Sequence, residues 1–168
     1  MSELFRFPNP VNEVSARLVA AGVVILCGLT LGLDQPWLMF PLAYGFVARV
    51  LTGPRLSPLG FLVTRVVTPR LPLPPRLVAG PPKRFAQGMG ATISTAAVVL
   101  HFGFGAAGVA DGLVAMILVA ASFEAAFALC LGCKIFGLLM RAGVIPEAAC
   151  SVCSDIASRQ AVGSLGRP

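Results

Sequence analysis

The sequence predicts an all-α integral membrane protein: a four-helix bundle with a cytoplasmic helical hairpin at its C-terminus. Of the 168 residues, 57% are hydrophobic and 12% are charged, whereas an ordinary soluble domain is about a quarter charged. The mean hydropathy is +0.86, and several apolar runs reach the length of about 20 residues that a helix needs to cross a bilayer. This composition excludes a disordered chain, a coiled coil and nearly every water-soluble globular fold.

Four apolar segments are expected to cross the membrane within a single domain, 1–168. They cover residues 14–33, 36–51, 85–104 and 111–133. Asn12 precedes the first segment as a suitable N-cap, and Pro36 suits the start of the second. The last two segments are rich in Gly and Ala, which let membrane helices approach one another closely. The remaining regions are a long loop, 52–84, and a cysteine-containing segment, 134–168.

The basic residues fall on one side of this topology. None lies between Arg17 and Arg49, and none lies between Arg84 and Lys134. Because cytoplasmic loops of membrane proteins carry an excess of Lys and Arg, the loop 52–84 and both termini are expected in the cytoplasm. Most of the net charge of +6 then serves to orient a multi-pass chain.

The loop 52–84 is basic and rich in proline, with a short surface helix expected near its centre. Ser57 is placed to cap this helix and Pro58 to be its first residue. The loop is expected either to attract anionic lipid headgroups or to bind an oxyanion or an acidic partner protein. The candidate residues for this binding are Arg55, Arg65, Arg70, Lys83 and Arg84. Nucleic acid is not expected, because the loop has no aromatic platform and no helical basic stripe.

Two C-x-x-C motifs are the main chemical feature of the sequence. The first is formed by Cys130 and Cys133, and the second by Cys150 and Cys153. Their spacing fits two dithiols that exchange electrons or relay sulfur. The spacing also fits a set of four thiolates that hold zinc or an iron–sulfur centre. In this alternative, the metal centre is a cofactor of the protein. A structural disulfide is the least expected use, because cytoplasmic thiols are kept reduced.

A helix stop and turn at residues 141–146 is expected to fold the C-terminal segment into an antiparallel hairpin that brings the four cysteines together. Cys130 and Cys133 are expected at the C-terminal end of the fourth span, where the helix dipole opposes ionisation of a thiol. Gly132 is a residue at which this helix can break. Lys134, directly after the motif, favours the thiolate.

Glu124 is the remaining candidate functional residue, because a carboxylate inside a membrane is costly and marks functional sites. Folding the third and fourth spans as a hairpin about Gly108 places it near Thr92, Ser94 and Thr95. Those hydroxyls can satisfy the carboxyl group without any function. The alternative is a proton carrier for thiol chemistry or for transport of a sulfur-containing anion, which is the third hypothesis for the chain. No Ser-His-Asp set, P-loop or dinucleotide-binding glycine pattern is present.

The segments 7–13, 53–59 and 80–87, together with Glu124 and the first C-x-x-C motif, carry a family resemblance over residues 5–155. They resemble a family of small bacterial membrane proteins of unknown function. The resemblance implies four spans, a location in the bacterial plasma (inner) membrane, and a thioredoxin-like or sulfurtransferase protein as a partner. It implies no catalytic residues. The other expected partners are the lipid bilayer and a second copy of the chain in a homo-oligomer.

Overall fold

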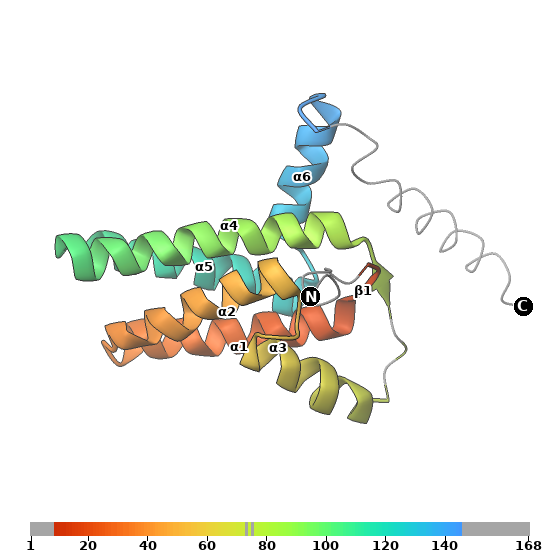
Figure 1. The fold of residues 1–168 in the computed structure, drawn as a ribbon, viewed down its shortest axis with the longest axis horizontal. Helices are drawn as coiled ribbons and strands as arrows, with labels where there is room; N and C mark the ends of the chain where they lie inside the picture. Colours follow the sequence, from red (N-terminus) through yellow and green to blue (C-terminus); the bar gives the residue numbers. More distant parts are fainter. Residues whose placement is uncertain (1–8, 73, 75, 146–168) are drawn as a thin grey trace, which may run out of the picture.

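A computed structural model of the chain describes residues 9–72, 74 and 76–145. The described chain is mostly helical, and its long helices lie alongside one another, with one further helix standing out from them (Figure 1). The long helices are α1 (Glu13–Gly32), α2 (Met39–Thr52), α4 (Gly80–Val98) and α5 (Ala107–Phe127), and the projecting helix is α6 (Leu131–Arg141). Cys150, Cys153 and the second arm of the expected hairpin lie outside the described residues.

Shorter elements connect these helices. They are η1 (Pro36–Leu38), α3 (Pro58–Leu62), η2 (Val63–Val67), η3 (Thr68–Arg70) and η4 (Val99–Gly103). A small antiparallel sheet pairs β1 (Val11–Asn12) with β2 (Leu77–Val78), so that the start of α1 lies beside the residues that precede α4. The backbone N–H of Glu13 adds a hydrogen bond of 2.7 Å to the carbonyl oxygen of Arg76.

Both capping residues expected from the sequence are confirmed. The Asn12 side chain accepts a hydrogen bond of 3.0 Å from the backbone N–H of Val14 at the start of α1. Ser57 accepts one of 3.3 Å from Gly60, and Pro58 is the first residue of α3. A side-chain oxygen at this position satisfies one of the backbone N–H groups that the first helical turn leaves without a partner.

In the described part of the chain, three helical segments are long and apolar enough to cross a membrane: Glu13–Gly32, Gly80–Gly103 and Ala107–Phe127. The second expected span coincides with η1 and α2, but α2 has only 14 residues. The expected third span begins earlier than predicted, at Gly80, because Pro81 and Pro82 are accommodated in the first turn of α4.

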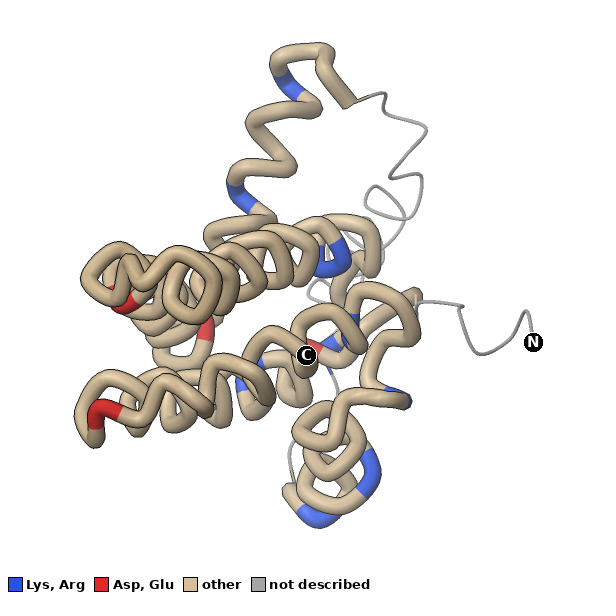
Figure 2. The backbone as a smooth tube through the Cα atoms, turned by 60° about the vertical axis from the view of Figure 1, so that its left-hand side comes forward, with Lys and Arg blue, Asp and Glu red and all other residues tan. Residues whose placement is uncertain are grey.

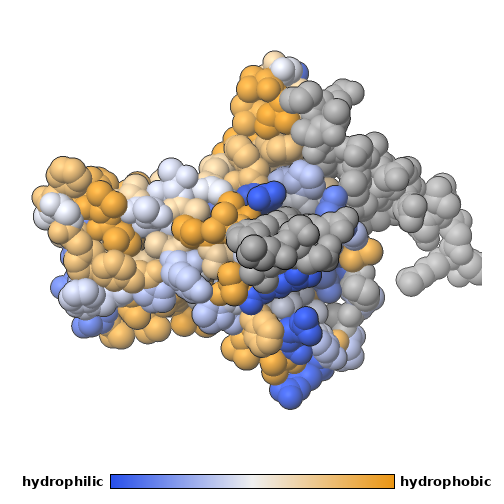
Figure 3. All heavy atoms as spheres, viewed as in Figure 1, coloured by the Kyte–Doolittle hydropathy of each residue, from blue (hydrophilic) through white to orange (hydrophobic). Residues whose placement is uncertain are grey.

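The outer surface of these helices is apolar. Large side chains are exposed along their length, including Ile25 on α1 (63% exposed), Tyr44 on α2 (54%) and Val119 on α5 (53%). Figure 3 shows hydrophobic atoms over much of the sides of the helices and the most strongly hydrophilic area near the end that holds the start of α4, with a smaller one at the opposite end. An extensive apolar surface of this kind is unfavourable in water and is typical of a protein surrounded by lipid.

Acidic and basic residues are also separated along the length of the long helices. The end of the molecule that holds the turn after α1 and the start of α5 carries acidic residues and no basic ones among the described residues (Figure 2). The acidic residues are Asp34 and Asp111, as the sequence predicts. Lys and Arg lie towards the opposite end and on α6.

Small residues set the packing between helices. α1 packs mainly on α5, and α2 mainly on α4, which also contacts α5 and α6. A Cβ atom at Gly90 on α4 would overlap the ring of Phe46 on α2, so these helices approach each other across a glycine. This agrees with the close approach that the Gly- and Ala-rich composition predicts.

Candidate dithiol site

A break in the chain positions the first C-x-x-C motif. The expected fourth span, 111–133, is wrong at its C-terminal end: α5 stops at Phe127, Ala128 adopts a left-handed conformation (φ 57°), and α6 starts at Leu131. The backbone N–H of Ala128 bonds to the carbonyl oxygen of Glu124 at 3.0 Å, which closes the last turn of α5. The break therefore precedes Gly132, the residue at which the sequence suggested it.

Arg17 stabilises the end of α5 from the neighbouring helix. Its guanidinium donates from Nε and Nη2 to the carbonyl oxygen of Ala125 (3.1 and 3.0 Å) and from Nη2 to that of Ala126 (3.0 Å). These carbonyls have no partner within a helix that stops here, and a cation at a helix C-terminus also complements the helix dipole. Arg17 thus holds the point at which the chain leaves α5 for the cysteines.

Cys130 lies at the N-terminus of α6, as its N-cap residue, and Cys133 lies in the first turn. The expectation that the helix dipole opposes ionisation of these thiols is therefore wrong. The N-terminus of a helix carries a partial positive charge, which favours a thiolate. Cys130 is buried (7% exposed), whereas Cys133 is half-buried.

An ion pair between Lys83 and Glu124 lies beside the two thiols. Lys83 comes from the first turn of α4 and is 8% exposed, and its Nζ binds Oε1 of Glu124 on α5. Lys83 was expected on the basic surface of the loop, and it is instead buried against a carboxylate. The charges of Lys83 and Glu124 both act on Cys130 and on Cys133.

The expected environment of Glu124 is wrong. Ser94 donates to the carbonyl oxygen of Gly90 (2.7 Å) and Thr92 to that of Gly88 (3.1 Å), so these hydroxyls bond to their own helix. The prediction folded the two spans about Gly108, but α5 has already begun at Ala107. An earlier turn brings Glu124 opposite a lower-numbered part of α4, where Lys83 is found.

The surroundings shift the pKa values of the two thiols in opposite directions. A hydrogen bond from the Cys133 thiol holds the pKa of Cys130 below its ordinary value. The Lys83 ammonium acts in the same direction, while burial and the charge of Glu124 act against it. The same hydrogen bond, together with burial and the charge of Cys130, raises the pKa of Cys133. Cys130 is therefore the thiol of the pair that ionises first, and Cys133 the one that keeps its proton longer.

The cysteines open into a pocket of about 280 Å³, which we call the dithiol pocket. Lys83, Cys130 and Cys133 line it together with the exposed Lys134, so a molecule in this pocket meets both thiols and two positive charges. Other lining residues are Glu13, Val78, Ala79, Pro82, Ala128 and Leu129.

Close packing fixes α6 on α4. A Cβ atom at Gly132 would lie 2.5 Å from Cβ and 2.6 Å from Cα of Ala86, so only glycine fits between the two helices here. Further along α6, the ring of Phe136 packs against that of Phe85, with centroids 5.6 Å apart. The position of Cys130 relative to Lys83 thus depends on two contacts between α4 and α6.

The other predicted site residues are spread out. Arg55, Arg65, Arg70 and Arg84 are exposed on the loop side of the molecule and do not line the dithiol pocket. The second cysteine pair, Cys150 and Cys153, is not described. Within the described residues, no three His, Cys, Asp or Glu side chains are grouped so as to hold a metal ion.

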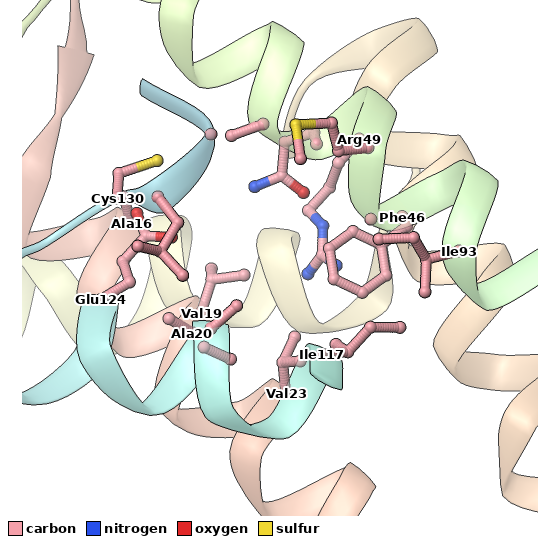
Figure 4. A pocket seen from close by; sticks show the side chains of 18 of the residues that line it. Ala16, Val19, Ala20, Val23, Phe46, Arg49, Ile93, Ile117, Glu124 and Cys130 are labelled. Atoms are coloured by element: carbon pink, nitrogen blue, oxygen red, sulfur yellow. The ribbon is translucent and has the colours of Figure 1, made fainter. Parts of the chain in front are cut away.

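The sequence analysis did not place Arg49 or Gln87 in a functional site. Both line a cavity of about 250 Å³ between the long helices, which we call the inner cavity. Figure 4 shows Arg49 and Phe46 on one side of this cavity, and Cys130 and Glu124 on the other. A detectable signal was present, since Arg49 is a lone arginine within an otherwise apolar segment.

Fold and site together define a helical protein with membrane-length apolar helices and a dithiol at the N-terminus of a helix. Residues 11–141 match the family described as Domain of unknown function (DUF4395), and the chain belongs to this family. The matched residues include Cys130 and Cys133 and end before Cys150. No curated protein and no solved structure matches the chain.

Proposed function

We propose that this protein is a membrane thiol–disulfide exchange or sulfur-relay protein in which Cys130 is the nucleophile and Cys133 the resolving thiol. The observation that supports this most is the position of Cys130 at the N-terminus of α6, beside Lys83 and Cys133. Thiolates, not thiols, attack disulfides, and these surroundings favour the thiolate.

In the exchange reaction, the Cys130 thiolate attacks one sulfur of a partner disulfide. A mixed disulfide forms, and the partner's other sulfur leaves as a thiolate and takes up a proton. Cys133 then loses its proton and attacks Cys130 within the mixed disulfide. The products are a Cys130–Cys133 disulfide and a partner reduced by two electrons.

The coupling between the cysteines orders these two steps. While Cys130 is a thiolate, its charge and its hydrogen bond keep Cys133 protonated. Once Cys130 is in a mixed disulfide, that negative charge is gone and Cys133 ionises more easily. Glu124 acts here as a positioning residue, because its carboxylate holds the Lys83 ammonium next to both sulfurs.

Sulfur relay uses the same first step. When the partner carries a persulfide, attack of Cys130 on its terminal sulfur gives a Cys130 persulfide and the partner's thiolate, with no net oxidation. The partner class that the family resemblance suggests, a thioredoxin-like or sulfurtransferase protein, supplies a disulfide or a persulfide of this kind.

The proposed setting is the bacterial plasma membrane, with η1 and α2 as a fourth, shorter span and with both termini in the cytoplasm. The basic end of the molecule, which includes the dithiol pocket, would then face the cytoplasm. Labelling of Cys133 by a membrane-impermeant thiol reagent in inverted but not in right-side-out vesicles tests this orientation.

The reaction of 5,5′-dithiobis(2-nitrobenzoate), a small aromatic disulfide, tests the proposed chemistry. The protein is purified in detergent with Cys150 and Cys153 changed to Ser, so that the first motif is studied separately. The proposal predicts that Cys130 releases one thionitrobenzoate, and Cys133 a second as the internal disulfide forms. Cys133→Ser is expected to stop at a stable mixed disulfide on Cys130.

Two results would contradict the proposal. One is a mixed disulfide that persists when both cysteines are present, because Cys133 would then not resolve it. The other is one tightly bound zinc ion per unaltered chain that is lost in Cys150→Ser/Cys153→Ser, which would favour the four-thiolate metal site. The matched control is Cys27→Ser, at a buried cysteine in α1 far along the chain from the motif.

A further inference from the structure

Arg49 places a buried guanidinium group at the inner cavity. It is 5% exposed, its Nε is fully buried, and the described residues provide no hydrogen-bond partner for it. Its contact is with the ring of Phe46, 4.5 Å from the guanidinium carbon. A buried charge without a hydrogen-bonded partner is unfavourable, so a site of this kind is expected to bind an anion.

Glu124 does not act as a hydrogen-bonded counter-ion of Arg49. Its carboxylate binds Lys83, and its charge reaches Arg49 only through space. Lys83 therefore takes up the carboxylate of Glu124 and also lies beside Cys130, and neither negative group forms a direct ion pair with Arg49 among the described residues. An anion that enters the inner cavity would pair directly with the Arg49 guanidinium.

The inner cavity has the shape for a molecule with one charged end. Its walls are mostly apolar and include Val19, Val23, Ile93 and Ile117. Gln87 adds a buried amide oxygen without a hydrogen-bond partner in the described structure. Rotation of this amide presents an NH₂ donor instead.

A second cavity, of about 330 Å³, adjoins the inner cavity and shares Ala16, Val19, Arg49 and Gln87 with it. We call it the vestibule. Its other walls are more polar and include Asn12, Ser15, Thr64 and Thr68 near the basic end of the molecule. Arg49 thus lies where a polar entrance meets an apolar cavity.

We propose that the inner cavity binds a small sulfur compound that carries a sulfonate or carboxylate group. The oxyanion binds Arg49 with help from Gln87, the body contacts the apolar walls, and the reactive sulfur lies towards Cys130. This inference rests on the proposed function, since it names the substrate class for the same nucleophile.

Charged and uncharged thiol reagents test the proposal. Detergent-purified protein with Cys133, Cys150 and Cys153 changed to Ser is treated with sulfonatoethyl methanethiosulfonate, which is anionic, or with methyl methanethiosulfonate, which is neutral. Intact-mass spectrometry follows modification of Cys130. Arg49→Met is expected to lower the anionic-to-neutral rate ratio about tenfold, as expected for loss of a charged hydrogen bond.

The matched control is Arg141→Met, which removes an exposed arginine at the far end of α6 and should leave the ratio unchanged. A competition experiment needs no variant at Arg49: ethanesulfonate should slow the neutral reagent at Cys130, whereas tetramethylammonium should not. An unchanged ratio in Arg49→Met and no protection by ethanesulfonate, with Cys130 still reactive, would overturn the anion site alone. A Cys130 that reacts with neither reagent would overturn the proposed function as well.

Discussion

Gly132→Ala is the change that most directly perturbs the placement of the dithiol. The added Cβ would lie 2.5 Å from Cβ and 2.6 Å from Cα of Ala86, whereas ordinary contacts begin at 3.4 Å. The Cα belongs to the backbone, so no side-chain rotation relieves the clash. The first turn of α6 must therefore move away from α4 by roughly 1 Å, at a cost of about 1–3 kcal/mol.

The displacement should be visible in both stability and reactivity. We expect a lower thermal denaturation midpoint in detergent. We also expect slower alkylation of Cys130 at neutral pH, because the thiol moves away from Lys83. Gly137→Ala is the matched control on the same helix: no atom lies within 4 Å of its added Cβ, and alanine should stabilise the helix by about 0.5–1 kcal/mol. Normal stability and normal Cys130 reactivity in Gly132→Ala would refute the close packing of α6 on α4.

Three further predictions concern the charges around the site. Lys83→Met should raise the pKa of Cys130, because the cation that favours the thiolate is lost, and Glu124→Gln should lower this pKa, because an opposing negative charge is lost. The pH dependence of Cys130 alkylation measures both shifts. Shifts in the same direction would contradict the opposite effects assigned to Lys83 and Glu124. Lys83→Met should also destabilise the protein by about 3–5 kcal/mol, because Glu124 is left as an unpaired, largely buried charge. Arg17→Met should cost about 1–3 kcal/mol by leaving the last carbonyls of α5 without donors, and denaturation equal to that of the unaltered protein would contradict this capping role.

The sequence predicted the helices well because each carries its own signal. Apolar runs of sufficient length, a capping Asn12 and the Ser57–Pro58 start are local features, and the structure reproduces them. The segregation of basic residues at one end also follows directly from their positions along the chain.

The chain break before Cys130 could not be predicted in the same way. The residue that adopts the left-handed conformation is Ala128, which has no preference for it, and its position depends on Arg17 from another helix. The sequence instead pointed to Gly132, whose role is close packing against α4. A difference of a few residues reversed the expected effect of the helix dipole on the cysteines.

The pairing of Lys83 with Glu124 was missed for a related reason. A hairpin register taken from one glycine placed the carboxylate opposite hydroxyls, and a turn a few residues earlier gave it a lysine. Lys83 also looked like part of a continuous basic surface, because the sequence does not show that α4 already begins at Gly80. Long-range pairs of this kind depend on where turns fall, which local patterns define poorly.

The pH dependence of alkylation at the first motif tests the central claim most directly. Purified protein with Cys150 and Cys153 changed to Ser is treated with limiting iodoacetamide over a range of pH, and peptide mass spectrometry assigns the modified cysteine. We predict that Cys130 is modified first. As the pH is lowered, the alkylation rate of Cys130 should begin to fall at a lower pH than the alkylation rate of an ordinary cysteine does. Preferential modification of Cys133, or a Cys130 profile at or above that of an ordinary cysteine, would contradict the account.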